Sequence, residues 1–259
     1  MDNPVVSGPV HGFNILWFAE LDSTNDEALR RMASRNFPTE FVVWAAHQTH
    51  GRGQGSNSWH SFPGENLLFS AVFHPPYLTA QDTFILNQVI AVAAHKVVSK
   101  YLPSGRLLLK WPNDLWVDQQ KLGGILVQTG ISGQYVKYAV AGLGLNVNTQ
   151  IFPSSLTQAT SMFRITGKTY PLDELLDCFL VELRSLLTDL EQNQIGHLKI
   201  YYLQHLLGWQ QMNFYSTPDG NLVPGRFLGI DDHGQMILET ERGVQTFQHQ
   251  QIKYLRPAE

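Results

Sequence analysis

Residues 106–124 read RLLLKWPNDLWVDQQKLGG, and this stretch says most about the chain. Three leucines predict a short buried strand that ends in Lys110 and a tryptophan. A Pro-Asn-Asp turn leads into a second strand, and a third strand begins at Lys121, just before a glycine pair. Two ammonium groups, one carboxylate and a glycine-lined backbone therefore meet at strand ends. Because fixed cations offset the repulsion between two anions, the stretch predicts a site where one anion attacks another.

A second segment, residues 48–59, reads QTHGRGQGSNSW. Three glycines in five residues let the backbone approach a ligand closely and adopt positive φ angles. Arg52 lies among them, and its guanidinium can bind phosphate through two parallel hydrogen bonds. The spacing matches neither the P-loop nor the dinucleotide-binding glycine motif. Taken alone, the segment fits a mobile surface loop equally well.

Composition narrows the class of protein. The chain has 259 residues, of which 43% are hydrophobic and 15% charged, so it can bury a large core. A net charge of −4 without a basic block argues against nucleic-acid binding. Cys178 is the only cysteine, which excludes an intrachain disulfide and a Cys-rich zinc site, and we expect it in the core. No apolar stretch approaches the roughly 20 residues that span a membrane, and no secretory signal is evident, so we expect a cytoplasmic protein.

Periodicity predicts an α+β chain that divides at residues 207 and 208. The first part alternates strands with helices, which we expect at about 23–35, 83–101, 172–190 and 195–207. We expect its strands at 13–18, 41–46, 66–73, 106–111, 114–118, 121–129 and 135–147. From Gly208 onward, short runs separated by tight turns predict a small β-barrel, with strands near 225–230, 235–240 and 244–249. Domains at 1–207 and 208–259 follow.

Five motifs occur in a fixed order, and together they carry a family resemblance. They are DSTN at 22–25, Gln48 with GRGQ at 51–54, KWPND at 110–114, KLGGIL at 121–126 and GLGLNVN at 142–148. From about residue 15 to 256 the chain resembles the biotin protein ligases. The resemblance implies a catalytic domain with a mixed sheet like that of class II tRNA synthetases, followed by an SH3-like barrel. One departure is visible, because Gly55-Ser56 follow GRGQ where the family often has a basic residue and then glycine.

The resemblance also implies a reaction in two steps. Biotin and ATP, with Mg²⁺, form biotinyl-5′-adenylate, and a lysine of a biotin carboxyl carrier protein or domain then takes the biotin. A closing glycine loop would protect the adenylate from water. We expect no winged helix that binds DNA, since the first strand is predicted near residue 13, and either a monomer or a homodimer.

Site roles are carried over by the same resemblance. The implied catalytic residues are Lys121, Arg52, Lys110 and Asp114, and Asp114 is also the implied magnesium ligand. The implied biotin contacts are Ser23, Thr24, Asn25, Gln48, Gly51, Arg52, Gly53, Gln54, Lys121 and Gly124. The implied ATP contacts are Arg52, Trp59, Lys110, Asn113 and Asn146.

Plainer interpretations stand beside these roles. Ser23, Thr24 and Asn25 suit a helix N-cap, Asn113 and Asp114 suit a turn, and Lys121 alone would suit exposed surface. The pair His47 and His50 lacks the ligand spacing of a transition-metal site in a strand. The alternatives in function are a lipoate or octanoyl ligase or transferase of the same fold, and a biotin-sensing protein without useful catalysis.

Overall fold

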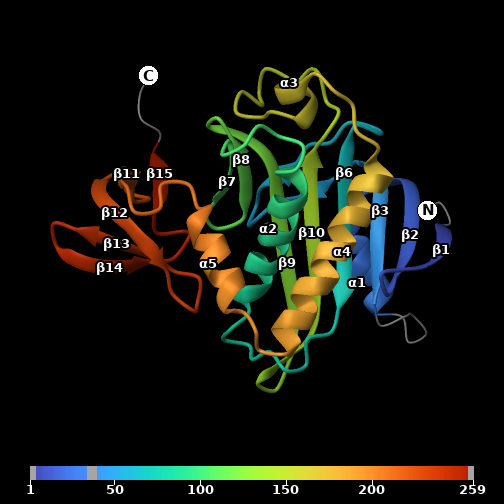
Figure 1. Cartoon of the computed structure of the whole chain (residues 1–259), viewed down its shortest axis with the longest axis horizontal. Helices are drawn as coiled ribbons and strands as arrows, with labels where there is room; N and C mark the ends of the chain where they lie inside the picture. The colour runs from blue at the N-terminus through green and yellow to red at the C-terminus, as the bar shows by residue number, and fades with distance from the viewer. Residues whose placement is uncertain (1–3, 34–39, 256–259) are drawn as a thin grey trace.

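The computed structural model describes residues 4–33 and 40–255 of the chain. A large mixed sheet with helices is followed by a separate antiparallel sheet, as Figure 1 shows. The predicted α+β class is therefore confirmed.

The large sheet has eight strands, of which only one neighbouring pair is parallel. Their order is β1 (Val5–Val10), β2 (Phe13–Leu21), β3 (Phe41–Gln48), β6 (Asn66–Phe73), β10 (Tyr135–Asn146), β9 (Gln120–Ser132), β8 (Asp114–Val117) and β7 (Leu107–Lys110). The parallel pair is β2 and β3, because helix α1 (Thr24–Met32) lies between them in the chain. This crossover brings the carboxyl ends of β2 and β3, with Gln48, to the same edge of the sheet.

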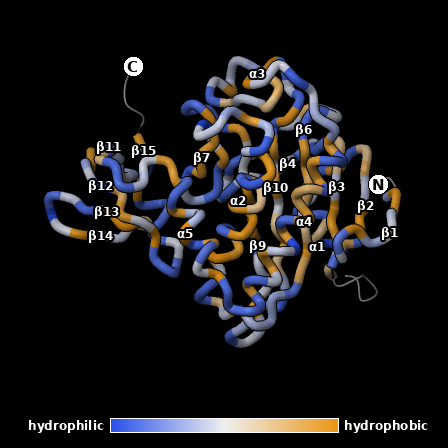
Figure 2. The backbone as a smooth tube through the Cα atoms, in the orientation of Figure 1, coloured by the Kyte–Doolittle hydropathy of each residue, from blue (hydrophilic) through white to orange (hydrophobic). Residues whose placement is uncertain are grey.

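The two faces of this sheet bury different apolar clusters. Helix α2 (Phe84–Val98) and helix α4 (Leu172–Glu191) pack against each other and on one face. Helix α1 packs on the other face, since alternate residues of β2 and β3 belong to its cluster. The leucines of α4 recur every three or four positions and are buried, as their period predicts. Figure 2 shows hydrophobic segments along the central strands and hydrophilic loops at their lower ends.

The C-terminal sheet has five antiparallel strands. Their order is β14 (Gly243–Phe247), β13 (Met236–Thr240), β12 (Leu222–Ile230), β11 (Met212–Ser216) and β15 (Lys253–Leu255). Helix α5 (Gly196–Gln204) precedes it and lies between it and the large sheet in Figure 1. The short helix α3 (Met162–Thr166) was not predicted from the sequence.

The expectation that the first strand begins near residue 13 is wrong. Strand β1 at Val5–Val10 pairs with β2 and forms one edge of the large sheet. Its sequence, VVSGPV, contains glycine and proline and is almost entirely exposed, so it lacks the alternation that marks a half-buried strand.

One apolar cluster joins the two sheets. Tyr215, Phe227 and Ile252 of the C-terminal part belong to the same cluster as the residues of α2 and α4. The Trp111 indole also donates a buried hydrogen bond of 2.9 Å to the carbonyl oxygen of Gly234. The change of sheet near residue 208 is therefore not a break in the core. Cys178 lies half-buried against this cluster.

Within residues 4–33 and 40–255, no helix has the length and apolar character needed to cross a membrane.

Candidate active site

A cavity of about 840 Å³ opens between the large sheet and the C-terminal sheet. Five segments line it: the start of α1, the ribbon of β4 (Gly51–Arg52) and β5 (Ser58–Trp59), the 110–114 turn, the glycine-rich parts of β9 and β10, and the edge of the C-terminal sheet. Four of the five sequence motifs therefore contribute most of their predicted residues to one cavity. We treat it as the candidate active site.

One end of the cavity is neutral and rich in hydrogen bonds. The backbone N–H and the hydroxyl of Thr24 both donate to Gln48 Oε1, over 2.7 and 3.0 Å. The Asn25 amide donates to the carbonyl of Leu126 and to Gln128 Oε1, and its Oδ1 accepts a 2.6 Å hydrogen bond from Ser70. All of these side chains except Gln128 are at least nine-tenths buried. They form a fixed polar lining that suits a neutral ligand with both donors and acceptors.

Ser23 caps α1, as its residue type predicts. It has extended backbone angles and its hydroxyl accepts from the backbone N–H of Asp26. The cap places Thr24 and Asn25 in the first turn of the helix, at the cavity wall. The N-cap interpretation and the site interpretation of these residues are thus compatible.

The other end of the cavity is charged. Lys121 Nζ lies 2.7 Å from Asp114 Oδ1, and both side chains are partly buried. Lys110 Nζ lies 3.9 Å from the centroid of the Trp116 ring, and Lys110 also lines the cavity. The structure pairs Asp114 with Lys121. The register of β8 and β9 explains this pairing. It brings Asp114 opposite Gly124, and the Lys121 ammonium lies beside Gly124.

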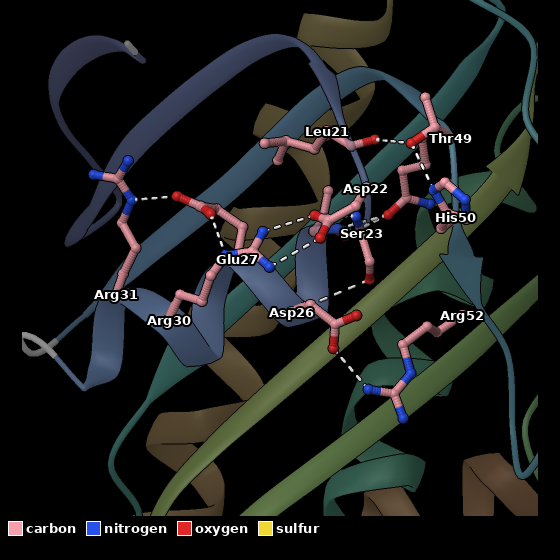
Figure 3. A network of polar contacts seen from close by, with 12 residues as sticks. Leu21, Asp22, Ser23, Asp26, Glu27, Arg30, Arg31, Thr49, His50 and Arg52 are labelled. Atoms are coloured by element: carbon pink, nitrogen blue, oxygen red, sulfur yellow. Dashed lines mark hydrogen bonds and ion pairs between the residues drawn. The ribbon is translucent and has the colours of Figure 1, made fainter. Parts of the chain in front are cut away.

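Arg52 is held by helix α1. Its Nη1 donates to Asp26 Oδ1 over 2.6 Å, at the edge of a wider network of charges on α1 (Figure 3). In that network the Arg30 guanidinium bonds Asp22 and holds the pKa of that carboxyl below its usual range. The 51–59 segment is a short hairpin rather than an irregular loop, since Gly53 N–H donates to the Asn57 carbonyl. Its mobility stays a prediction.

Trp59 lies flat against glycines of the sheet. A Cβ at Gly144 would lie 2.5 Å from Trp59 Cε2, and one at Gly124 would lie 3.3 Å from its Cζ3. The indole N–H is buried and has no hydrogen-bond partner among the described residues. Lys121 Nζ lies 5.7 Å from the centroid of the same ring. The indole therefore lies between the neutral and the charged ends of the cavity, with an N–H that a ligand could engage.

The structure does not bring every predicted residue to the cavity. Asn146 is not part of the lining, because its Oδ1 accepts from Asn66 and its Nδ2 donates to the Thr160 carbonyl. Asn113 does line the cavity, but its amide donates to the carbonyl of Ile125 and fastens the turn to β9. Gly51 lies outside the lining, and a Cβ there would meet the Trp59 carbonyl oxygen at 2.6 Å.

The acidic, histidine and cysteine side chains do not gather into a metal site in the described residues. No group of three or more His, Cys, Asp or Glu side chains that could hold an ion occurs in the described parts of the chain. His47 pairs with Glu20 instead. Among the described residues that line the cavity, Asp114 is the only acidic one.

Sequence reasoning missed a whole wall of the cavity. His249, Lys253 and Thr217 line it from the C-terminal sheet. Burial lowers the pKa of His249, and the nearby Asp114 carboxylate opposes that shift. None of these residues carries a motif, so only their packing against the 110–114 turn reveals them. Ser70 and Gln128, which hold Asn25, were missed because neither belongs to a motif that the sequence singled out.

The comparisons with known proteins agree with this geometry. Residues 17–146 match the family described as Biotin/lipoate A/B protein ligase family. The bifunctional ligase/repressor BirA of Bacillus subtilis is 30% identical over 242 residues, covering 91% of this chain and 72% of that protein. The biotin–[acetyl-CoA-carboxylase] ligase of Paracoccus denitrificans is 28% identical over 237 residues, covering 88% and 95%.

Among solved structures, a biotin protein ligase from Aquifex aeolicus in complex with biotin and ATP has the same fold. The TM-score is 0.77 at 23% identity, and the match covers 94% of this chain and 99% of that one. The chain belongs to the biotin/lipoate A/B protein ligase family.

Proposed function

We propose that this chain is a biotin protein ligase. It joins biotin to the AMP part of ATP and then transfers the biotin to a lysine of a biotin carboxyl carrier protein or domain. The division of the cavity carries the proposal, because a neutral hydrogen-bonding end adjoins a cationic end in a chain of this family. Biotin has the matching parts, a neutral ureido ring and a carboxylate. Relatives that are named as biotin ligases support biotin over lipoate.

In the first step the biotin carboxylate attacks the α-phosphorus of ATP. A bond forms between a carboxylate oxygen and phosphorus, and the bond from phosphorus to the pyrophosphate oxygen breaks. Thr24, Asn25 and Gln48 hold the ureido ring, so that the carboxylate extends toward Lys121. The ammonium of Lys121 offsets the charge that accumulates as the two anions approach. Arg52 exchanges Asp26 for the phosphate, since both are anions within its reach.

In the second step the lysine amine of the acceptor attacks the acyl carbon. A nitrogen–carbon bond forms, AMP leaves with the oxygen, and the amine gives up a proton. The C-terminal sheet lines the open side of the cavity, so we assign residues 208–259 to closing the site or meeting the acceptor, and residues 1–207 to binding biotin and ATP.

A magnesium ion would enter this site with ATP. Asp114 can supply one carboxylate oxygen, and phosphate oxygens and water would supply the rest, which is the usual manner of binding magnesium beside nucleotides. When bound, the ion would neutralise phosphate charge. Asp114 would then divide its oxygens between the ion and Lys121.

A direct assay tests the proposal. The full chain is incubated with ATP, a carrier domain and either labelled biotin or labelled lipoate, and label on the carrier is counted. We expect ATP-dependent transfer of biotin and none of lipoate. Transfer of lipoate alone would assign the other activity of the family, and binding of biotin without transfer would indicate a sensor.

Lys121→Ala tests the site itself. Pyrophosphate release at saturating ATP should fall by about 100-fold or more, because the reacting anions lose a fixed cation. Lys137→Ala is the matched control, since Lys137 is an exposed lysine on β10 outside the cavity. Near-normal turnover of folded Lys121→Ala would remove Lys121 from the reaction.

A further inference from the structure

A second cavity, of about 380 Å³, lies away from the candidate active site. It lies where the end of α4, helices α2 and α5, the end of β12 and the 77–82 segment meet. The two cavities share no lining residue. Its volume falls within the range of small-molecule sites. Six of the fourteen residues that line it are aliphatic: Leu78, Ile85, Leu190, Ile195, Leu203 and Ile230.

Among the polar residues that line the cavity, one is a buried amide on a mostly apolar helix. Gln88 of α2 lines the cavity, is only 7% exposed and makes no side-chain hydrogen bond with any described residue. The other buried residues of α2 are apolar except His95, which bonds both Tyr201 and the Leu107 carbonyl. The Gln88 amide is not among the fully buried polar atoms of the described residues that lack a partner, so it keeps access to the cavity. The Gln88 amide is therefore available to a molecule inside the cavity.

The charged side chains that line the cavity, which we call its mouth, are mostly acidic. Asp82, Glu191, Asp231 and Asp232 line it, against a single ammonium, Lys199. Lys199 is already engaged, 2.6 Å from Asp232 Oδ1, and Glu191 has no ion-pair partner among the described residues. Burial, and then the charge of Glu191, raise the pKa of the Tyr77 phenol to about 12, so the field of Glu191 reaches into the cavity. Such a mouth attracts cations and repels anions such as ATP and biotin.

We propose that this second cavity binds a small organic cation, namely an arylalkyl ammonium with a hydroxyl group at its far end. The ammonium lies among the carboxylates of the mouth, the ring packs against the aliphatic wall, and the hydroxyl meets the Gln88 amide. Each part of the ligand thus complements one feature of the cavity: the ammonium complements the carboxylates, the ring the aliphatic side chains, and the hydroxyl the Gln88 amide. An anion would be repelled, and a purely apolar molecule would leave Gln88 unsatisfied.

The test uses tyramine as the probe and the full chain with labelled isoleucine methyl groups. Ile85, Ile195 and Ile230 line the small cavity, whereas Ile125 and Ile252 line the large one. We expect saturable shifts of the first three methyl signals at millimolar tyramine, with the other two unchanged. Absence of saturable shifts, or shifts only at the second pair, overturns the proposal.

Two simpler probes separate the contributions of the ligand. Phenethylamine lacks the hydroxyl, and 4-ethylphenol lacks the ammonium. Gln88→Leu should weaken tyramine about three- to tenfold, the worth of one hydrogen bond, and leave phenethylamine unchanged. Equal effects on both amines would contradict the assigned contact, as would equal binding of 4-ethylphenol and tyramine.

Glu191→Gln tests the charged mouth. It should weaken both amines and reduce the dependence of their binding on salt, because the remaining attraction is smaller. Glu241→Gln is the matched control, since Glu241 is exposed in the turn between β13 and β14 and lines neither cavity. If both variants weaken the amines equally, net charge rather than the cavity explains binding, and the proposal fails. If circular dichroism shows that Gln88→Leu is unfolded, the unaltered chain provides the test. Tyramine should then bind more tightly than phenethylamine, and equal affinities would overturn the proposal.

Discussion

Gly142→Ala should break the neutral end of the candidate active site. A Cβ at Gly142 would lie 2.1 Å from Asn25 Oδ1, and the φ angle of Gly142 lies outside the left-handed region, so alanine clashes without straining the backbone. Asn25 Oδ1 must retreat by roughly 1 Å to regain ordinary van der Waals contact. Asn25 is 3% exposed and is fixed by bonds to Ser70, Gln128 and the Leu126 carbonyl, so it cannot move without losing them.

The size of the effect follows from those bonds. At about 1 kcal/mol for each hydrogen bond, losing two or three of them lowers the free energy of unfolding by about 2–3 kcal/mol. Urea unfolding followed by circular dichroism measures this change, and titration with biotin should show weakened binding. The control is Gly196→Ala, since a Cβ there meets no atom within 4 Å, and its effect should stay within about 1 kcal/mol.

A double mutant decides whether the clash is the cause. In an Asn25→Ala background the oxygen that collides is gone, so Gly142→Ala should add little further destabilisation. Additive effects of the two substitutions would refute the reasoning. A change below about 0.5 kcal/mol for Gly142→Ala alone would do the same.

Three further outcomes are expected. Asp26→Asn should free Arg52 and make the 51–59 hairpin more sensitive to limited proteolysis than the control Glu241→Gln does. The free energy of unfolding should change by less than about 1 kcal/mol, because the Arg52–Asp26 pair is partly exposed. Unchanged cleavage of the hairpin would contradict the contact. Burial lowers the pKa of His95 to about 4, below that of the unfolded chain, so its contribution to stability is complete above about pH 6.5 and is lost as the pH falls toward 4. His95→Gln should therefore flatten the fall in urea midpoint between pH 7 and pH 5, and an identical fall in both proteins would be the contrary result. A chain ending at Leu207 should melt at a lower temperature or fail to melt cooperatively, because the shared apolar cluster is cut, and an unchanged midpoint would show that the two parts have separate cores.

Much of the fold could be predicted because its signals are local. The period of α2 and α4 and the unbroken apolar run of β6 each reflect burial along one segment. Strand β1 could not be predicted, since an exposed edge strand has no buried face to impose alternation. Strand β15 has three residues and is defined only by pairing with β11. Such elements depend on their neighbours rather than on their own sequence.

The site residues also fall into those that belong to local motifs and those that depend on distant packing. Thr24, Gln48 and Lys121 were placed in the site by the family resemblance of their motifs, and all three line the cavity. Asn146 lies on the same strand face as Gly144, and alternation alone would place it in the cavity. The 149–161 segment covers it, a packing that the strand pattern does not report. The wall formed by the C-terminal sheet likewise depends on contacts more than 100 residues apart, such as that between Trp111 and Gly234.

The position of Trp59 has an optical consequence. Its indole rests on Gly124 and Gly144 at the boundary between the neutral and charged ends, and Trp111 lines the same cavity. Two of the six tryptophans of the chain thus border the same cavity. Indole emission shifts in wavelength with the polarity of its surroundings, so a molecule that displaces water there changes the intrinsic fluorescence of the unlabelled protein. The cavity consequently carries its own reporter, and the rates of ligand entry and departure can be followed in a stopped-flow fluorimeter.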